Sequence, residues 1–355
     1  MPVGCTYLSH SQPLTVPYSS VYGLRIRSDR PIPQVPHNTS TTHVDLQVSL
    51  GVPPEVPDAL NAGAARWYPS DNRDDQGQST LVISKLDDGA WFHLRYADGT
   101  EFLVDRPGTR LWATWQEPLT VEDTATYLLG PVMGFVLLLR GTHALHASAV
   151  DVGGHAIALV GPAGAGKSTT AATFAKLGYS VLAEDVTTLA REGGELMVQP
   201  AYPCIRLWPE SVEALFGAPN ALPLLTPNWD KRFLDLAGED GRFRFQSDAL
   251  PLRAIYFLGE RSEATDAPRI EAVAPQAGMI ELVANAYIPH LKDKAARADE
   301  FRVLRQVMAT VPLRRAIPSA DLGRVAELCA VILGDFRELT ERDDSTSAAG
   351  QRECI

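Results

Sequence analysis

The chain has 355 residues, of which 45% are hydrophobic and 21% are charged, and its formal net charge is −11 at pH 7. This composition is typical of a soluble globular protein that is long enough for two domains of ordinary size. The negative charge argues against a general nucleic-acid binder, because such proteins gain most of their affinity from lysine and arginine side chains that neutralise phosphates. We therefore expect no nucleic-acid partner.

Cysteine usage favours a reducing compartment. Cys5, Cys204, Cys329 and Cys354 are far apart and form no CxxC pair, so neither a disulfide framework nor a zinc site is indicated. A cytoplasmic location fits this usage best.

Neither a leader nor a membrane span is expected. Residues 1–20 lack a basic stretch followed by an apolar core, which is the pattern of a signal peptide. The longest apolar run, residues 127–139, is 13 residues long, too short to cross a bilayer. We interpret it as a buried helix interrupted near Pro131, and we expect no membrane partner.

Residues 1–119 are expected to form a β-rich domain for recognition or scaffolding. Residues 22–27 and 43–50 alternate between polar and apolar side chains, as half-buried strands do. The clearest hairpin joins residues 91–96 and 101–104 near Asp98-Gly99, a residue pair that favours a type I′ turn.

A second domain is expected over residues 120–340. Thr120 is placed to cap a helix, and it marks the boundary between the two domains. Later core strands are predicted at 252–258 and 311–317. Ser319 is then predicted to cap a final helix that ends at Gly334. The polar tail, residues 341–355, is predicted to be disordered.

The second domain contains a phosphate-binding pattern. Residues 156–160 have the apolar character of a buried strand and run into GxxxxGKS, which is followed by a helix-forming run. Glycines allow positive φ, so that backbone N–H groups and the helix N-terminus face one anion. Lys167 would approach the β- and γ-phosphates, and the Ser168 hydroxyl would bind Mg²⁺. The predicted nucleotide site comprises Gly161, Gly164, Ala165, Gly166, Lys167, Ser168 and Thr169, with ATP and Mg²⁺ as its ligands.

A histidine precedes this loop on a predicted hairpin. Gly153-Gly154 separates two β-like runs, which indicates a two-residue turn. The resulting register places His146 opposite Gly161, at the mouth of the phosphate loop. His146 is therefore a candidate for catalysis, and the alternative is a structural histidine that holds the loop by a hydrogen bond.

Two carboxylates follow the next β-like run, residues 179–183, which suits a short parallel strand that completes a βαβ unit. Ligands of such sheets bind beyond the carboxyl ends of the strands, where Glu184 and Asp185 emerge. One carboxylate can hold Mg²⁺ while the other accepts a proton from an attacking hydroxyl. The alternative is a pair of solvated loop acids.

A cation near the transferred phosphoryl group would stabilise its charge. Lys231 and Arg232 are the first choice, and Arg232 is included among the nucleotide-binding candidates. Arg314 and Arg315 compete for this role, and paired basic residues are also common on solvated faces.

From His146 to Leu189 the chain resembles the catalytic domain of HPr kinase/phosphorylase, which phosphorylates a serine of the phosphocarrier protein HPr. The resemblance rests on the histidine-bearing strand, the hairpin, GxxxxGKS and the carboxylate pair. It implies an α/β P-loop kinase domain of the HPr kinase/PEP carboxykinase-like type that uses ATP and Mg²⁺. It also implies that Glu184 is the base, that Asp185 assists Mg²⁺ together with Ser168, and that His146 lies beside Glu184.

Over most of its length the chain is similar to HPr-kinase-related proteins of peptide-modification clusters, through residues 22–25, 203–209 and 231–232. Some of these proteins phosphorylate the C-terminal serine of a lasso-peptide precursor. The resemblance therefore implies a precursor peptide rather than HPr as the acceptor.

We accordingly expect an ATP- and Mg²⁺-dependent serine kinase that acts on a peptide or small protein. Three alternatives stay open: a nucleotide-gated binding or scaffold protein, an NTPase switch, and a kinase for a small hydroxylated metabolite. The chain contains no LSGGQ signature and no NKxD motif, which disfavours the switch. A homo-oligomer is also compatible with the sequence.

Overall fold

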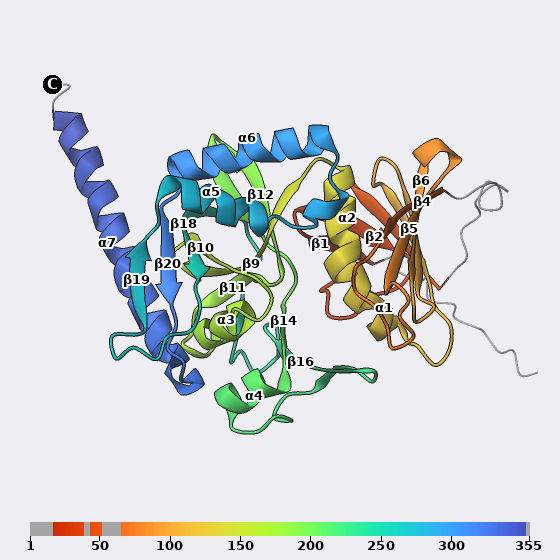
Figure 1. The fold of residues 1–355 in the computed structure, drawn as a ribbon, viewed down its shortest axis with the longest axis horizontal. Coiled ribbons are helices and arrows are strands. Elements are labelled where there is room, and N and C mark those ends of the chain that lie inside the picture. The colour runs from red at the N-terminus through yellow and green to blue at the C-terminus, as the bar shows by residue number, and fades with distance from the viewer. Residues whose placement is uncertain (1–16, 39–42, 52–64, 353–355) are drawn as a thin grey trace, which may run out of the picture.

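The computed structural model describes residues 17–38, 43–51 and 65–352, and these residues contain three β-sheets and the helices that pack on them (Figure 1). The eight-stranded N-terminal sheet has the order β1-β2-β3-β8-β7-β6-β5-β4. Its strands are β1 (Tyr18–Val21), β2 (Leu24–Ser28), β3 (Leu46–Leu50), β4 (Ala65–Pro69), β5 (Leu81–Leu86), β6 (Trp91–Tyr96), β7 (Glu101–Asp105) and β8 (Arg110–Thr114).

The nine-stranded central sheet contains β9 (His143–Val152), β10 (His155–Val160), β11 (Ser180–Ala183), β12 (Val186–Glu192), β13 (Glu195–Gln199), β17 (Arg244–Phe245), β18 (Leu250–Leu258), β19 (Arg269–Ala272) and β20 (Leu313–Ile317). A third sheet consists of β14 (Cys204–Leu207), β15 (Leu224–Thr226) and β16 (Trp229–Asp235). The α-helices are α1 (Val121–Tyr127), α2 (Met133–Leu139), α3 (Lys167–Lys176), α4 (Pro209–Phe216), α5 (Pro275–Ala284), α6 (Lys294–Thr310) and α7 (Val325–Arg352).

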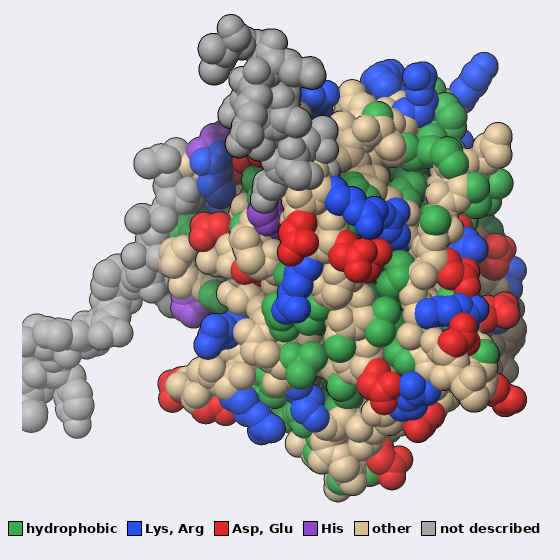
Figure 2. Space-filling view, turned by 90° about the vertical axis from the view of Figure 1, so that its left-hand side faces the viewer, with side chains coloured by type: hydrophobic (Ala, Val, Ile, Leu, Met, Phe, Trp, Pro, Cys, Tyr) green, Lys and Arg blue, Asp and Glu red, His purple; other side chains and the backbone are tan. Residues whose placement is uncertain are grey.

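On the face in Figure 2, acidic and basic side chains are interspersed.

At two turns of the N-terminal sheet the structure differs from the sequence prediction. Tyr22 and Gly23 have positive φ, +59° and +79°, and form the turn between β1 and β2, so the strand predicted from Tyr22 begins only at Leu24. At the hairpin of β6 and β7, Gly99 has φ +92° but Asp98 is not in the left-handed region. The predicted type I′ turn is therefore wrong, because that turn needs positive φ at both residues.

The helical segment after Thr120 begins as predicted. The Thr120 hydroxyl accepts from the Asp123 N–H, and the Asp123 carboxylate accepts from the Thr120 N–H, which completes a capping box. A π-helical turn around Pro131 joins α1 to α2. The segment Val121–Leu139 is long and apolar enough to cross a membrane, but 72% of its most apolar window is buried inside the protein.

This segment packs on the N-terminal sheet, although the sequence assigned it to the second domain. The ring of Phe135 in α2 lies 5.1 Å from that of Phe92 in β6 and 6.1 Å from that of Trp67 in β4. The same hydrophobic core continues to Leu145 in β9. In Figure 1, α1 and α2 (yellow) accordingly lie between the N-terminal sheet and the central sheet.

A glycine in α2 permits a close approach that reaches the candidate site. A Cβ atom at Gly134 would lie 2.1 Å from the ring of Tyr287, which packs beside the His146 ring. We expect Gly134→Ala to lower the free energy of unfolding by about 1–3 kcal/mol through overpacking. Urea denaturation measures this change. Gly130→Ala is the matched control, since its Cβ would meet only ordinary contacts, and an equal loss in both variants would contradict the explanation.

The hairpin of β9 and β10 has the predicted register. Val152 pairs with His155 and Ala147 with Val160, and both turn glycines have positive φ, +64° and +82°. Strand β11 differs from expectation, because it pairs antiparallel with β9. It therefore runs parallel to β10 with β9 between them, so the βαβ unit joins strands that are not neighbours. Strands β18 and β20 confirm the two later core strands, and both lie parallel to β10.

The last helix is longer than predicted. Asp321, rather than Ser319, caps the short 3₁₀ turn before it, and α7 continues through Gly334 to Arg352. Ile332 and Phe336 on either side of this glycine are buried, and their packing outweighs the glycine's cost of about 1 kcal/mol in a helix. Residues 341–352, predicted from the sequence as part of a disordered tail, lie in α7, and residues 353–355 lie outside the described residues.

Candidate functional site

The phosphate loop leads from β10 directly into α3. Gly164 and Gly166 have φ of +83° and +100°, a region that glycine enters without steric cost. Gly161 does not have positive φ, but it is needed for space, since a Cβ there would lie 3.0 Å from Ala165 Cβ and 3.3 Å from the Leu258 carbonyl oxygen. The loop therefore places the N-terminus of α3 where backbone N–H groups can bind an anion.

Lys167 is held inside this loop. Its buried ammonium donates to the carbonyl oxygens of Gly161, at 2.6 Å, and Pro162, at 3.0 Å. Burial lowers the pKa of Lys167 to about 8, although Asp185 and Glu184 act against this effect. Thr169 differs from expectation, because its hydroxyl lies 2.8 Å from that of Ser211 in α4, so its side chain contacts α4 rather than lining the loop.

Ser168 and Glu184 form one half of the site. The Ser168 hydroxyl, in the first turn of α3, donates to Glu184 Oε1 at 2.7 Å. Glu184 is buried, and its Oε2 lies 3.4 Å from Nε of Arg206. Burial raises the pKa of Glu184, and Asp185 adds to the rise, against the lowering effect of Arg206.

Asp185 forms the other half of the site and contacts Arg206 and His146. It has the left-handed φ of +68°, which turns the carboxylate toward Arg206, whose Nη2 donates at 3.1 Å, and toward His146, whose Nε2 lies 3.7 Å away. Burial alone would raise the pKa of Asp185, but Arg206 and His146 hold it below its usual value. Asp185 is therefore ionised near neutral pH.

The histidine lies beside a different carboxylate from the one the resemblance implied. His146 pairs with Val186 across the sheet, and its backbone N–H donates to the Asn285 carbonyl oxygen. Its side chain approaches Asp185 rather than Glu184. Burial lowers the pKa of His146 more than Asp185 raises it, so the imidazole is mostly neutral at pH 7.

Arg206 was not among the predicted site residues. Its buried side chain on β14 contacts both carboxylates, and Nη1 lies 3.5 Å from the Thr126 carbonyl oxygen in α1. Buried charges are almost always paired, so an arginine between Ile205 and Leu207 in an apolar run was the available signal. The identity of its partners could not be predicted, because Glu184 and Asp185 lie in a distant turn, between β11 and β12.

Of the paired basic residues, Lys231 rather than Arg232 faces the carboxylates. Successive side chains of strand β16 point to opposite faces. Lys231 lines the cavity that Asp185 and Arg206 also line, and its charge lowers the pKa of Asp185. Arg314 pairs with Asp335 away from the carboxylates, whereas Arg315 pairs with Glu281 and lines a separate cavity beside Gly164 of the phosphate loop. Of the four cations predicted for this role, Lys231 is therefore the one that lies beside the carboxylates.

The donor set fits Mg²⁺ at one position. Mg²⁺ takes oxygen ligands and keeps several waters, so one or two protein side chains suffice. The Ser168 hydroxyl and the Glu184 carboxylate supply such oxygens side by side, beside the phosphate loop. Asp185, the predicted metal ligand, is directed to Arg206 and His146 instead. No cluster of three or more metal-ligating His, Cys, Asp or Glu side chains occurs within the described part of the chain.

No protein-family model matches the chain, and no curated protein matches it. Among solved structures, the chain is similar to the Hpr(Ser) kinase/phosphatase from Coxiella burnetii, with 12% sequence identity and a TM-score of 0.33. This match covers 57% of the present chain and 96% of the other.

Proposed function

We propose that this protein is a kinase that transfers the γ-phosphoryl group of ATP, in the presence of Mg²⁺, to a serine hydroxyl of a peptide or small protein. The observation that carries this proposal is the meeting of three groups at one edge of the central sheet. These are the phosphate loop with Lys167, the Ser168–Glu184 pair, and Asp185 on the side of the cavity.

The nucleotide's phosphates would lie along the backbone N–H groups of residues 161–168, with the Lys167 ammonium beside the β- and γ-phosphates. Ser168 and Glu184 would hold Mg²⁺, which neutralises charge on the phosphates when it is bound. Because positioning and charge neutralisation provide most of the catalysis in phosphoryl transfer, a rigid loop next to paired carboxylates suits this reaction.

Asp185 would act on the acceptor. The serine oxygen attacks the γ-phosphorus while the bond from that phosphorus to the bridging oxygen of ADP breaks, and the serine proton passes to the Asp185 carboxylate. Arg206 and His146 orient this carboxylate, and the Lys231 ammonium would stabilise charge on the transferred group. This assignment exchanges the roles of Glu184 and Asp185 relative to the resemblance, because Glu184 is the carboxylate beside Ser168.

The proposal is tested by incubating the protein with γ-labelled ATP, Mg²⁺ and a pool of serine peptides. We expect label on serine with the wild type, and loss of this label with Lys167→Ala. Lys176→Ala, at the far end of the same helix, is the matched control. Label that persists at the wild-type rate in Lys167→Ala would overturn the proposal. So would tight ATP binding by the wild type without transfer to any acceptor.

A further inference from the structure

A cavity of about 760 Å³ leads from Asp185 toward the N-terminal sheet. Three parts of the fold form its walls: β4 to β6 with their connecting loops, the helical segment α1 to α2, and the short 3₁₀ helix Pro289–Leu291. Asp185, Arg206 and Lys231 line its catalytic side. The cavity is therefore continuous with the proposed site of transfer, and its other walls lie in a part of the chain that this transfer does not otherwise use.

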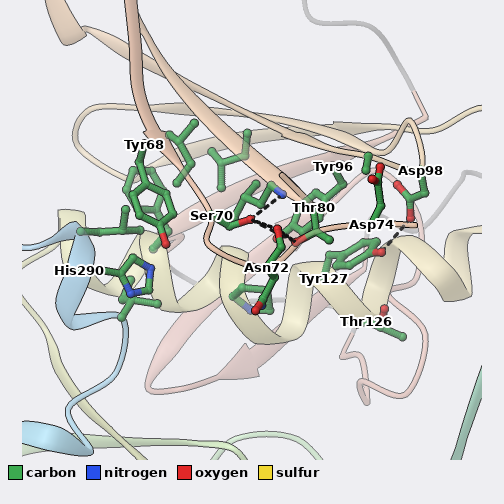
Figure 3. A pocket seen from close by; sticks show the side chains of 18 of the residues that line it. Tyr68, Ser70, Asn72, Asp74, Thr80, Tyr96, Asp98, Thr126, Tyr127 and His290 are labelled. Atoms are coloured by element: carbon green, nitrogen blue, oxygen red, sulfur yellow. Dashed lines mark hydrogen bonds between the residues drawn. The ribbon is translucent and has the colours of Figure 1, made fainter. Parts of the chain in front are cut away.

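The walls are mainly apolar and aromatic. Tyr68 and His290 stack with ring centroids 4.7 Å apart at one end, as Figure 3 shows. Tyr96 and Tyr127 stack at 3.9 Å at the other end, and Trp229 lies edge-on to Tyr127. The aliphatic residues of the lining are Leu81, Ile83, Leu94, Pro131, Ile288 and Leu291. Such a surface favours apolar side chains over charged ones.

One wall also carries polar groups at intervals. The Ser70 hydroxyl lies 3.1 Å from that of Thr80 and donates to the Asn72 carbonyl oxygen, as the dashed lines in Figure 3 mark. The Tyr96 hydroxyl is buried and has no hydrogen-bond partner among the residues that the structure describes. Because that oxygen has almost no accessible surface, the polar residues that a ligand could reach on this wall are Ser70, Asn72 and Thr80.

Charge is distributed unevenly around the cavity. Lys231 and Arg206 lie at the catalytic side, whereas Asp74 and Asp98 line the wall formed by the N-terminal sheet. The Asp98 carboxylate accepts from the Tyr127 hydroxyl, and Asp74 accepts from backbone N–H groups of its own loop. Acidic side chains in a ligand would therefore be repelled on the side away from the catalytic carboxylate.

We infer that this cavity binds the acceptor, and that the acceptor is a peptide segment with apolar or aromatic side chains next to the phosphorylated serine. The inference rests on the proposed kinase function and adds the recognition site. A single serine would occupy only a small part of the cavity, whereas a short segment places its hydroxyl at Asp185, its apolar side chains between the two aromatic pairs, and its amide groups along the polar wall.

The test of the acceptor class uses short synthetic peptides with one serine, in which each neighbouring position is varied in turn. We expect kcat/KM for peptides with Leu, Phe or Tyr beside the serine to exceed that for Asp or Glu by about tenfold or more, the range a filled apolar pocket provides. If N-acetylserine amide were phosphorylated as efficiently as the best peptide, the acceptor would be a small molecule and the inference would be overturned.

The test of the cavity uses a substitution that fills it. Thr80→Trp should raise KM for the best peptide by about tenfold or more without changing the affinity for a fluorescent ATP analogue. Ser79→Trp, at the adjacent position that does not line the cavity, is the matched control. If Thr80→Trp lowers the melting temperature, His290→Ala is used in its place. We expect His290→Ala to raise KM for peptides with an aromatic side chain more than KM for peptides with an aliphatic one.

These measurements separate the inference from the proposed function. If the wild type binds the ATP analogue but phosphorylates no peptide and no N-acetylserine amide, the kinase function itself is wrong. If the wild type phosphorylates peptides while the cavity variants behave like Ser79→Trp, transfer stands and the cavity is not the acceptor site.

Discussion

Replacing Asp185 by asparagine should slow phosphoryl transfer by about 10²–10⁴-fold, the usual contribution of a positioned proton acceptor. The substitution keeps the shape of the side chain, and asparagine tolerates the left-handed backbone found at this position. Nucleotide affinity should change much less than the rate, because Asp185 contacts Arg206 and His146, whereas Ser168 contacts Glu184. Single-turnover kinetics with labelled ATP, together with a separate ATP-binding measurement, check both expectations.

Glu184→Gln is the matched control, because it changes the neighbouring carboxylate in the same way. We expect this variant to require more Mg²⁺ and to regain part of its rate when the Mg²⁺ concentration is raised, whereas Asp185→Asn should not respond. The reverse pattern, with rescue of Asp185→Asn alone, would show that Glu184 is the proton acceptor, as the family resemblance implied.

Replacing Arg206 by methionine should lower the free energy of unfolding at neutral pH by about 3–5 kcal/mol, because it leaves the buried Glu184 carboxylate and the half-buried Asp185 carboxylate without their cation. Arg206 contacts Glu184 at 3.4 Å and Asp185 at 3.1 Å, and its side chain is only 7% exposed. Urea denaturation at about pH 7.5 measures the loss. Arg253→Met is the control, since its ion pair with Glu195 is exposed and should contribute less than about 1 kcal/mol.

The loss of unfolding free energy in Arg206→Met should depend on pH in one direction. In the wild type, Arg206 helps to hold the pKa of Asp185 below its usual value. Asp185 therefore contributes stability above its unfolded-state pKa, and this contribution is lost as pH falls through its folded-state pKa. Without Arg206, burial raises the pKa of both carboxyls, so ionising them at neutral pH costs stability. The difference between variant and wild type should shrink as pH falls toward 5, and a difference that grows in acid would contradict this account.

The parts of the site that could be predicted from sequence are those fixed by short-range chemistry. GxxxxGKS between an apolar run and a helix specifies the phosphate loop, because glycine spacing and the helix N-terminus determine which backbone groups converge. The two-residue turn at Gly153-Gly154 sets the register of the hairpin, and this register placed His146 at the loop. Glu184 and Asp185 emerge at the expected end of β11.

The parts that could not be predicted depend on contacts between distant segments. Arg206 reaches the carboxylates because β14 packs on α3, with Ile205 and Leu207 in the same hydrophobic core as Phe174. The carboxylate beside His146 was expected to be Glu184 and is Asp185. The left-handed φ of Asp185, which sets the direction of its side chain, could not be predicted from the sequence. The packing of α1 and α2 on the N-terminal sheet is likewise set by tertiary contacts, through Phe135 and Phe92, and not by helix propensity.

The structure of a complex with a non-hydrolysable ATP analogue, Mn²⁺ in place of Mg²⁺, and a serine peptide tests the central claim most directly. We expect the γ-phosphate beside the Lys167 ammonium, the metal ion bound by Ser168 and Glu184, and the serine hydroxyl within hydrogen-bond distance of Asp185. Phosphates bound away from residues 161–168, or a serine held on the far side of the molecule from Asp185, would contradict it.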